Sequence, residues 1–145
     1  MAGRRATGLS LWRPEARWTK PDSDEPVIAF LPSRLWLIGL GNLGQAFSWA
    51  LAALPYGDRS KVELFLQDFD TLAVSNISTS LLTFPEAVGQ KKTRMVAAWL
   101  GGRKFKTMIE ERRYGAWTKR DSSEAGAAFC GVDNALARRA GRSGV

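Results

Sequence analysis

Short apolar runs alternate with longer mixed segments from residue 35 onward. Residues 35–38 (Leu-Trp-Leu-Ile) form a run without a polar break, which is typical of a strand buried on both faces. Residues 45–54 have a helical composition, and Pro55 and Gly57 follow as a stop signal. Residues 62–66 (Val-Glu-Leu-Phe-Leu) then predict a second strand.

The second half of the pattern repeats this order. Residues 85–100 predict a helix, with Gly101 and Gly102 at its C-terminal cap. Residues 106–110 and 127–132 predict the third and fourth strands. Strands that alternate with helices favour an α/β fold, a Rossmann-like, mostly parallel sheet with helices on both faces. Four strands would leave an exposed sheet edge, so we expect a truncated version of that fold.

Composition supports a globular protein. Hydrophobic residues make up 45% of the 145 residues, a normal value for a chain with an apolar core. The single cysteine, Cys130, has no partner within the chain for a disulfide, and the absence of histidine argues against a zinc cluster. No secretory signal and no apolar stretch of membrane-spanning length is visible. A cytoplasmic protein without a membrane partner is therefore expected.

The formal charge of +7 is concentrated at the two ends of the sequence. Residues 1–20 carry +4 and residues 134–145 carry +3, so residues 21–133 are neutral. Because a nucleic-acid groove needs basic side chains on the folded body, we expect no nucleic-acid partner.

A glycine pattern stands at the point where the first strand should pass into the first helix. Gly39, Gly41 and Gly44 have the G-x-G-x-x-G spacing. In that setting the first glycine permits a tight turn, the second lets the backbone approach a phosphate, and the third lets helix and strand pack closely. The free N–H groups of the helix then attract an anion. This context predicts a nucleotide site.

Asp68 ends the second predicted strand, where a carboxylate can accept both hydroxyls of a nucleotide ribose. A turn-capping aspartate is the alternative. An acid here also disfavours a 2′-phosphate, which argues against NADP. Together with the glycine turn, Asp68 predicts a dinucleotide-type fold but does not separate NAD, FAD and ATP.

Three further motifs separate them. Residues 68–76 read D-F-D-T-L-A-V-S-N, residues 89–92 read G-Q-K-K, and residues 131–134 read G-V-D-N. In this order and spacing, residues 35–139 resemble the ThiF, MoeB, HesA and ubiquitin-activating family of adenylating enzymes, in its N-terminal half. On that basis we divide the chain into an irregular lead-in (1–33), a ThiF-type nucleotide-binding half-domain (34–140) and a basic tail (141–145).

The resemblance implies a role for each matching residue. Gly39, Gly41 and Gly44 would cradle ATP, and Asp68 and Asp70 would contact the nucleotide, Asp68 at the ribose. Asn76 would lie near the phosphates. The catalytic positions would be Lys92, which contacts the phosphates, and Asp133, which is associated with Mg²⁺.

The chemistry of adenylation suits these residue types. A carboxylate attacks the α-phosphorus of ATP and pyrophosphate leaves, so two anions must meet and cations must neutralise them. Lysine and Mg²⁺ supply that charge, and no protein nucleophile or histidine base is needed. Taken alone, Lys92 could be a solvated helix lysine and Asp133 a helix N-cap.

The sequence departs from the family pattern at two places. Thr79 stands where the family has an arginine that reaches the triphosphate, and the loss of that charge-assisted contact should impair activity. Arg13 or Arg17 could replace it from a partner in a homodimer. The chain also ends soon after Asp133, without the family's carrier-docking region, so we expect a fragment.

The leading hypothesis is a ThiF-type protein that uses ATP and Mg²⁺ to adenylate the C-terminal carboxylate of a ubiquitin-like or sulfur-carrier protein. Truncation and Thr79 could leave it inactive, so a non-catalytic nucleotide-binding or interaction module is the first alternative. An NAD-dependent oxidoreductase is the second, but it leaves residues 89–92 and Asp133 unexplained.

Overall fold

The computed structural model of the chain describes residues 30–115 and 125–132. Contacts divide the chain into two units, residues 1–31 and residues 32–145, and the sheet lies in the second unit. Within the described residues, no helix has both the length and the hydropathy needed to cross a bilayer.

Four parallel strands form the sheet. They are β1 (Arg34–Ile38), β2 (Glu63–Gln67), β3 (Lys106–Glu110) and β4 (Ala127–Cys130). Their order across the sheet is β3-β2-β1-β4, and every neighbouring pair is parallel. The chain therefore builds the sheet outward from β1, first toward β3 and then back to β4 on the other side. This order confirms the Rossmann-like α/β prediction.

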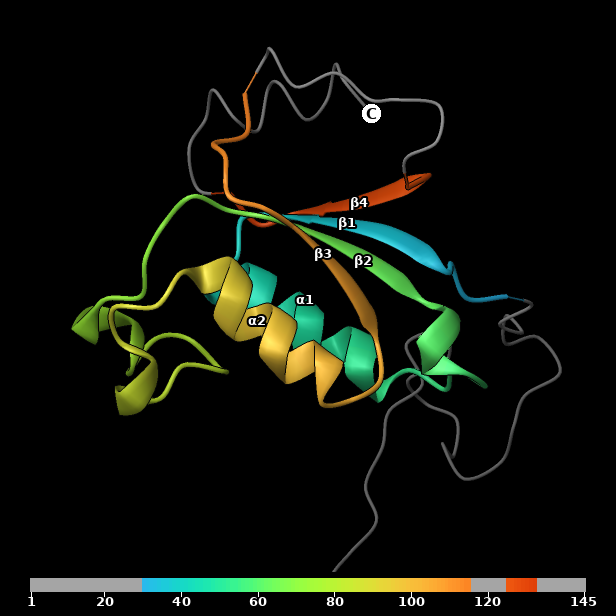
Figure 1. Cartoon of the computed structure of the whole chain (residues 1–145), viewed down its shortest axis with the longest axis horizontal. Helices are drawn as coiled ribbons and strands as arrows, with labels where there is room; N and C mark the ends of the chain where they lie inside the picture. Colours follow the sequence, from blue (N-terminus) through green and yellow to red (C-terminus); the bar gives the residue numbers. More distant parts are fainter. Residues whose placement is uncertain (1–29, 116–124, 133–145) are drawn as a thin grey trace, which may run out of the picture. The chain divides into compact units, whose positions relative to one another are not determined.

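Two helices connect the strands, α1 (Asn42–Ala53) between β1 and β2, and α2 (Lys92–Gly101) between β2 and β3. Figure 1 shows both helices below the sheet, on the same face. Short 3₁₀ turns occur in the connections at η1 (Arg59–Lys61), η2 (Val74–Asn76) and η3 (Pro85–Ala87).

The alternation of side chains along the strands produces two cores. Leu35 and Leu37 belong to the larger core, together with residues of β2, α1 and α2. Trp36 and Ile38 belong to a smaller core on the opposite face, where they pack against Tyr114 and Ala125. The described helices thus cover only one face, so the part of the prediction that placed helices on both faces is not met within the described residues.

The predicted helix over residues 85–100 is wrong over residues 85–91. Only a 3₁₀ turn occurs at 85–87, and α2 begins at Lys92. Between them Gly89 has φ +89°, and its N–H donates to Leu72 O while Leu72 N–H donates to Gln90 O. Because this backbone pairs with a loop distant in sequence, it cannot also make helical hydrogen bonds.

The end of α2 also differs in detail. Gly102 is the C-cap, as expected, but it has the right-handed conformation, with φ −58°. The residue with positive φ is Lys104, at 72°. The backbone N–H of the next residue, Phe105, then donates to Leu100 O and leads the chain into β3.

Candidate nucleotide site

The three glycines of the turn between β1 and α1 have different structural roles. Gly39 has φ +79°, a conformation that favours glycine. A Cβ on Gly44 would lie 1.9 Å from Gly39 O, so the helix can approach the turn only without a side chain there. A Cβ on Gly41 would meet nothing within 4 Å. Gly41 therefore leaves space open at the start of α1, whereas Gly44 permits packing within the chain.

A cavity of about 600 Å³ opens in front of this turn. Its walls include residues that directly follow the strands: Gly39 after β1, Asp68 after β2 and Gly131 after β4. In open parallel sheets, ligands bind at such carboxyl ends, beside the strand from which the chain order reverses. Here that strand is β1, with β2 on one side and β4 on the other.

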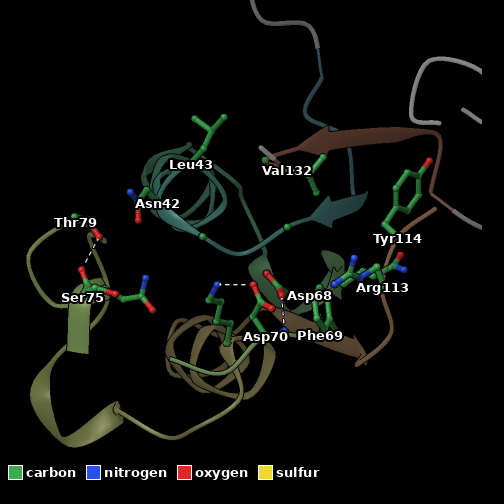
Figure 2. Close-up of a pocket in the computed structure, with 16 residues that line it drawn as sticks. Asn42, Leu43, Asp68, Phe69, Asp70, Ser75, Thr79, Arg113, Tyr114 and Val132 are labelled. Atoms are coloured by element: carbon green, nitrogen blue, oxygen red, sulfur yellow. Dashed lines mark hydrogen bonds and ion pairs between the residues drawn. The ribbon is translucent and has the colours of Figure 1, made fainter. Parts of the chain in front are cut away.

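The two ends of the cavity differ in chemistry. Figure 2 shows Ser75 and Thr79 on the side of the cavity opposite Arg113 and Tyr114. The first end is polar, and the second combines aromatic rings with one guanidinium. The polar end is lined by Asn42, Ser75, Asn76, Thr79 and Lys92, and the aromatic end by Gln67, Phe69, Arg113 and Tyr114.

Asp68 is held rigidly between the two ends. Its side chain is buried, and its Oδ2 accepts a hydrogen bond of 2.6 Å from Leu40 N–H in the glycine turn. Its Oδ1 accepts a second bond, of 2.8 Å, from Asp70 N–H. Each carboxylate oxygen can accept more than one hydrogen bond, so both keep capacity for a ligand hydroxyl. Asp68 thus joins the turn to the end of β2.

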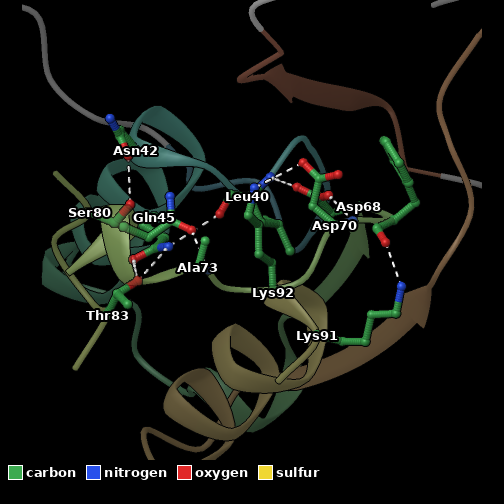
Figure 3. A network of polar contacts seen from close by, with 12 residues as sticks. Leu40, Asn42, Gln45, Asp68, Asp70, Ala73, Ser80, Thr83, Lys91 and Lys92 are labelled. Atoms are coloured by element: carbon green, nitrogen blue, oxygen red, sulfur yellow. Dashed lines mark hydrogen bonds and ion pairs between the residues drawn. The ribbon is translucent and has the colours of Figure 1, made fainter. Parts of the chain in front are cut away.

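Lys92 is the first residue of α2, and its side chain is only 12% exposed. Its Nζ donates a hydrogen bond of 3.0 Å to Asp70 Oδ2. Both residues are labelled in Figure 3. An ammonium group has three donors, so one bond to Asp70 leaves two for another acceptor in the cavity. Neighbouring Lys91 is half-buried, donates to Phe69 O and does not line the cavity. Lys92 is therefore not a solvated helix lysine.

A buried amide fixes the loop beside the polar end. Gln45, in α1, is fully buried; its Nε2 donates to Leu40 O, and its Oε1 accepts from Leu82 N–H. The hydroxyl of Thr83 lies within 3.2 Å of both polar atoms of the Gln45 amide (Figure 3). These contacts tie residues 80–83 to the glycine turn and so position Thr79 at the cavity wall.

The aromatic end is built from the residues that follow β2 and β3. The guanidinium of Arg113 lies 4.3 Å from the centre of the Phe69 ring, a stacked cation–π contact. Tyr114 is buried and packs edge-on against Trp36 at 6.1 Å between ring centres. Burial, and secondarily the charge of Cys130, raise the pKa of Tyr114 above its usual value of 10.0. Its phenol therefore stays neutral at physiological pH.

Glu111, which follows β3, links α2 to the segment that carries Arg113 at the aromatic end of the cavity. It accepts two hydrogen bonds from the Arg94 guanidinium, at 2.8 and 3.1 Å, and one from the Thr93 hydroxyl at 3.1 Å. The bond from Arg94 is the main reason that the pKa of Glu111 is lowered below its usual 4.5. Since Thr93 follows Lys92 and Glu111 precedes Arg113 by two positions, this contact fixes the spacing between both sides of the cavity.

The structure brings together most of the residues that the sequence predicts for the site. The predicted residues that line the cavity are Gly39, Gly41, Asp68, Asp70, Asn76 and Lys92. Gly44 packs beneath the turn, and the side chain of Asn76 also accepts from Ala73 N–H. Asp133, Arg13 and Arg17 lie outside the described residues. Whether these residues bind a nucleotide stays a prediction.

Sequence reasoning missed the aromatic end. Gln67, Arg113 and Tyr114 belong to no motif, and Phe69 served only as the spacer between two aspartates. Their common signal is position, because each lies at or just after the carboxyl end of β2 or β3. That signal becomes useful only once β2 and β3 are known to be neighbours.

Mg²⁺ finds less support in this part of the chain. Within residues 30–115 and 125–132, no group of three acidic, histidine or cysteine side chains could hold a metal ion. Of the two cavity carboxylates, Asp70 is paired with Lys92 and Asp68 with backbone N–H groups. The expected magnesium ligand, Asp133, is not among the described residues.

The sheet order, the glycine turn and the cavity define a Rossmann-like α/β domain. Residues 31–144 match the family model described as the BilD C-terminal domain, and the chain belongs to that family. The chain is also 59% identical over 140 residues to the bacterial E1-like protein BilD of Collimonas sp. (strain OK412). That alignment covers 97% of this chain but only 30% of the relative, so the chain spans less than a third of the relative's length.

Solved structures agree on the fold. The E. coli tRNA N6-threonylcarbamoyladenosine dehydratase TcdA, crystallised with ATP, superposes with a TM-score of 0.62 at 16% identity, covering 74% of this chain and 44% of that one. A second structure, TcdA (CsdL), gives 0.64 at 17% identity, covering 74% and 42%. These two structures support the fold, and the family shown is that of the BilD C-terminal domain, whose 59% identical relative is described as a bacterial E1-like protein.

Proposed function

We propose that this chain carries the ATP site of an E1-like protein that adenylates the C-terminal carboxylate of a ubiquitin-like or sulfur-carrier protein. The observation that carries the proposal is the position of Lys92. Its side chain is largely buried at the edge of a cavity that also contains the open side of Gly41 and the start of α1. An anion in that cavity would meet a lysine, backbone N–H groups and the positive end of a helix.

The volume and the lining residues of the cavity support a nucleoside triphosphate as its ligand. Its volume of about 600 Å³ lies within the range of small-ligand pockets. The polar end, beside α1 and α2, would take the phosphates. Asp68, between the ends, would accept the ribose hydroxyls. The 59% identical relative is described as an E1-like protein, which supports the same class of protein for this chain.

In the proposed reaction a carboxylate oxygen of the carrier forms a bond to the α-phosphorus, and the bond from that phosphorus to pyrophosphate breaks. Lys92 would reduce the repulsion between the two anions, and Asp70 would hold its ammonium in place. Mg²⁺ would supply further positive charge at the phosphates, with Asp133 as the proposed ligand. No residue of the cavity needs to accept a proton, because the carboxylate is already ionised at neutral pH.

Thr79 favours one alternative, a module that binds the nucleotide without turning it over. Its hydroxyl donates to Ser75 O within the loop, so this side chain adds no charge to the polar end of the cavity. Within the described part of the chain, the cation that lines this end is Lys92. An enzyme would then need another cation from elsewhere, whereas a binding module would not.

Pyrophosphate exchange into ATP separates the two functions. The whole chain is incubated with ATP, Mg²⁺, labelled pyrophosphate and candidate carrier proteins, each with a free and with an amidated C-terminus. We expect exchange only with a free carboxylate, its loss in Lys92→Ala and Asp133→Ala, and its retention in Lys61→Ala, a control on the exposed 3₁₀ turn η1. ATP binding without exchange would favour the module, and absence of ATP binding would contradict both functions.

A further inference from the structure

One buried polar atom in the cavity has an unfilled hydrogen-bonding capacity. Gln67, the last residue of β2, is 1% exposed and lines the cavity. Its Nε2 donates a hydrogen bond of 3.2 Å to Arg112 O. Its Oε1 has no hydrogen-bond partner among the described residues. Buried side-chain oxygens are normally paired, so an orphaned one beside a cavity points to a ligand donor.

Turning the Gln67 amide over does not give the orphaned oxygen a partner among the described residues. Rotation of the amide would exchange Nε2 and Oε1 and break the hydrogen bond to Arg112 O. Two groups would then be unpaired, the amide donor and the Arg112 carbonyl, in place of one unpaired acceptor. The amide is therefore fixed with its acceptor unused. The missing partner must be a hydrogen-bond donor.

The surroundings of Gln67 suit a flat, aromatic ligand group. The stacked pair of Phe69 and Arg113 lies at the same end of the cavity, and residue Phe69 is 39% exposed. Aromatic rings and guanidinium planes are the surfaces on which bases stack. Tyr114 lines the same end.

The order of strands also favours this end of the cavity for the base of a nucleotide. The proposed phosphate end lies at the carboxyl end of β1, and the proposed ribose ligand, Asp68, follows β2. Continuing in the same direction, the next strand is β3, whose following residues include Arg113. A nucleotide laid along this edge with its phosphates at the glycine turn would bring its base to Gln67, Phe69 and Arg113.

We propose that Gln67 is the residue that selects the nucleobase, with its Oε1 accepting a hydrogen bond from the exocyclic amino group of adenine. This inference rests on the proposed function, since it assumes a nucleoside triphosphate in the cavity. Guanine and hypoxanthine carry a carbonyl oxygen where adenine carries that amino group. Such an oxygen would face Oε1 acceptor to acceptor, and the site would reject it.

The test varies the nucleotide and the residue together. Dissociation constants of the whole chain are measured for ATP, for inosine triphosphate and for the triphosphate of purine riboside, which lacks the amino group but keeps the ring. For the unaltered chain we expect the purine riboside nucleotide to bind about tenfold more weakly than ATP, and inosine triphosphate more weakly still.

The variant Gln67→Met keeps the length of the side chain and removes the acceptor. In this variant the preference for ATP over the purine riboside nucleotide should fall to about one- to twofold. The control Gln90→Met alters an exposed glutamine of the same size and should keep the tenfold preference. A purely structural role for Gln67, through its bond to Arg112, would weaken both nucleotides equally and leave their ratio unchanged.

The outcomes separate this inference from the function on which it rests. Equal binding of ATP and the purine riboside nucleotide by the unaltered chain would overturn the role of Gln67 and leave the ATP site standing. An unchanged preference in Gln67→Met would do the same. Binding of none of the triphosphates would overturn the proposed function together with the inference. The first comparison needs no variant, so it stands even if Gln67→Met does not fold.

Discussion

Two glycines of the same turn should respond in opposite ways to the same substitution. The structure gives Gly44 a packing role and Gly41 an open position at the cavity. Replacing each by alanine adds one methyl group to the turn. The stability of the fold should depend on Gly44, and ligand binding should depend on Gly41.

The magnitude for Gly44→Ala follows from the contact distances. Its Cβ would lie 1.9 Å from Gly39 O and 2.9 Å from Gly39 C, against an ordinary carbon–oxygen contact of about 3.4 Å. The helix or the turn would have to move by more than about 1 Å. Gly39 is itself held by a hydrogen bond from its N–H to Gln67 O. Overpacking of this kind should cost about 3 kcal/mol or more.

The same substitution at Gly41 should leave the fold intact. Its φ of −72° suits any L-residue, and nothing lies within 4 Å of the added Cβ. The change in unfolding free energy should therefore stay within about 0.5 kcal/mol. The methyl group would instead narrow the approach of a phosphate to the start of α1, and ATP affinity should fall at least tenfold, as a rough expectation for a lost charge-assisted contact.

Urea unfolding and ATP titration, both on the whole chain, check the pair. With a denaturant slope of about 1.5 kcal/mol per M, Gly44→Ala should lower the urea midpoint by about 2 M. Gly41→Ala should keep the midpoint of the unaltered chain and lose affinity. A normal midpoint for Gly44→Ala would refute the packing argument, and normal ATP affinity in Gly41→Ala would refute the phosphate role of the turn.

Three further changes test other parts of the structure. Because the pKa of Glu111 is lowered in the fold, its contribution to stability is present above pH 4.5 and lost as the pH falls through the folded value. Below pH 4.5 the melting temperature of Glu111→Gln should therefore decrease less steeply with falling pH than that of the unaltered chain. Equal slopes of melting temperature against pH would contradict this. Gln45→Met should lower the unfolding free energy by about 2 kcal/mol, since Leu82 N–H loses its buried acceptor. Proteolysis should then begin in residues 80–83. An unchanged cleavage pattern would argue against the role of Gln45 in holding these residues to the glycine turn. Lys104→Gly should raise the unfolding free energy by up to about 0.5 kcal/mol, and with it the urea midpoint, because glycine tolerates the φ of 72°. A lowered midpoint would show that the larger loss of backbone entropy on folding outweighs the relief of backbone strain.

The sequence predicted the sheet and the glycine turn because both depend on local patterns. The first strand is an apolar run, and the glycines occur at fixed spacing directly after it. Lys106–Glu110 was predicted with the bounds that the structure has. Such elements need only neighbouring residues to be recognised.

Other features depend on contacts between distant residues, and the sequence could not supply these. The helix predicted from residue 85 begins at Lys92 because the backbone at Gly89 and Gln90 pairs with Leu72. The stack of Arg113 on Phe69 exists only because β3 lies beside β2. Both cases require the strand order and the loop pairing, which no local pattern contains.

In the site, too, some features follow from local motifs and others from contacts between distant residues. Lys92 could be assigned from its motif, but its burial and its bond to Asp70, which follows β2, depend on where α2 begins relative to the end of that strand. Gln67 directly follows the predicted strand over residues 62–66 and belongs to no motif. Only the structure shows that its amide is buried, bonded to Arg112 O at one end and unpaired at the other among the residues that the structure describes.

Calorimetric titration of the whole chain with ATP in the presence of Mg²⁺ tests the central claim most directly. The account predicts saturable one-to-one binding that is tighter than binding of NAD and at least tenfold weaker in Lys92→Ala, because a charge-assisted contact is lost. No heat of binding, tighter binding of NAD, or an unchanged affinity in Lys92→Ala would contradict an ATP site built around this cavity.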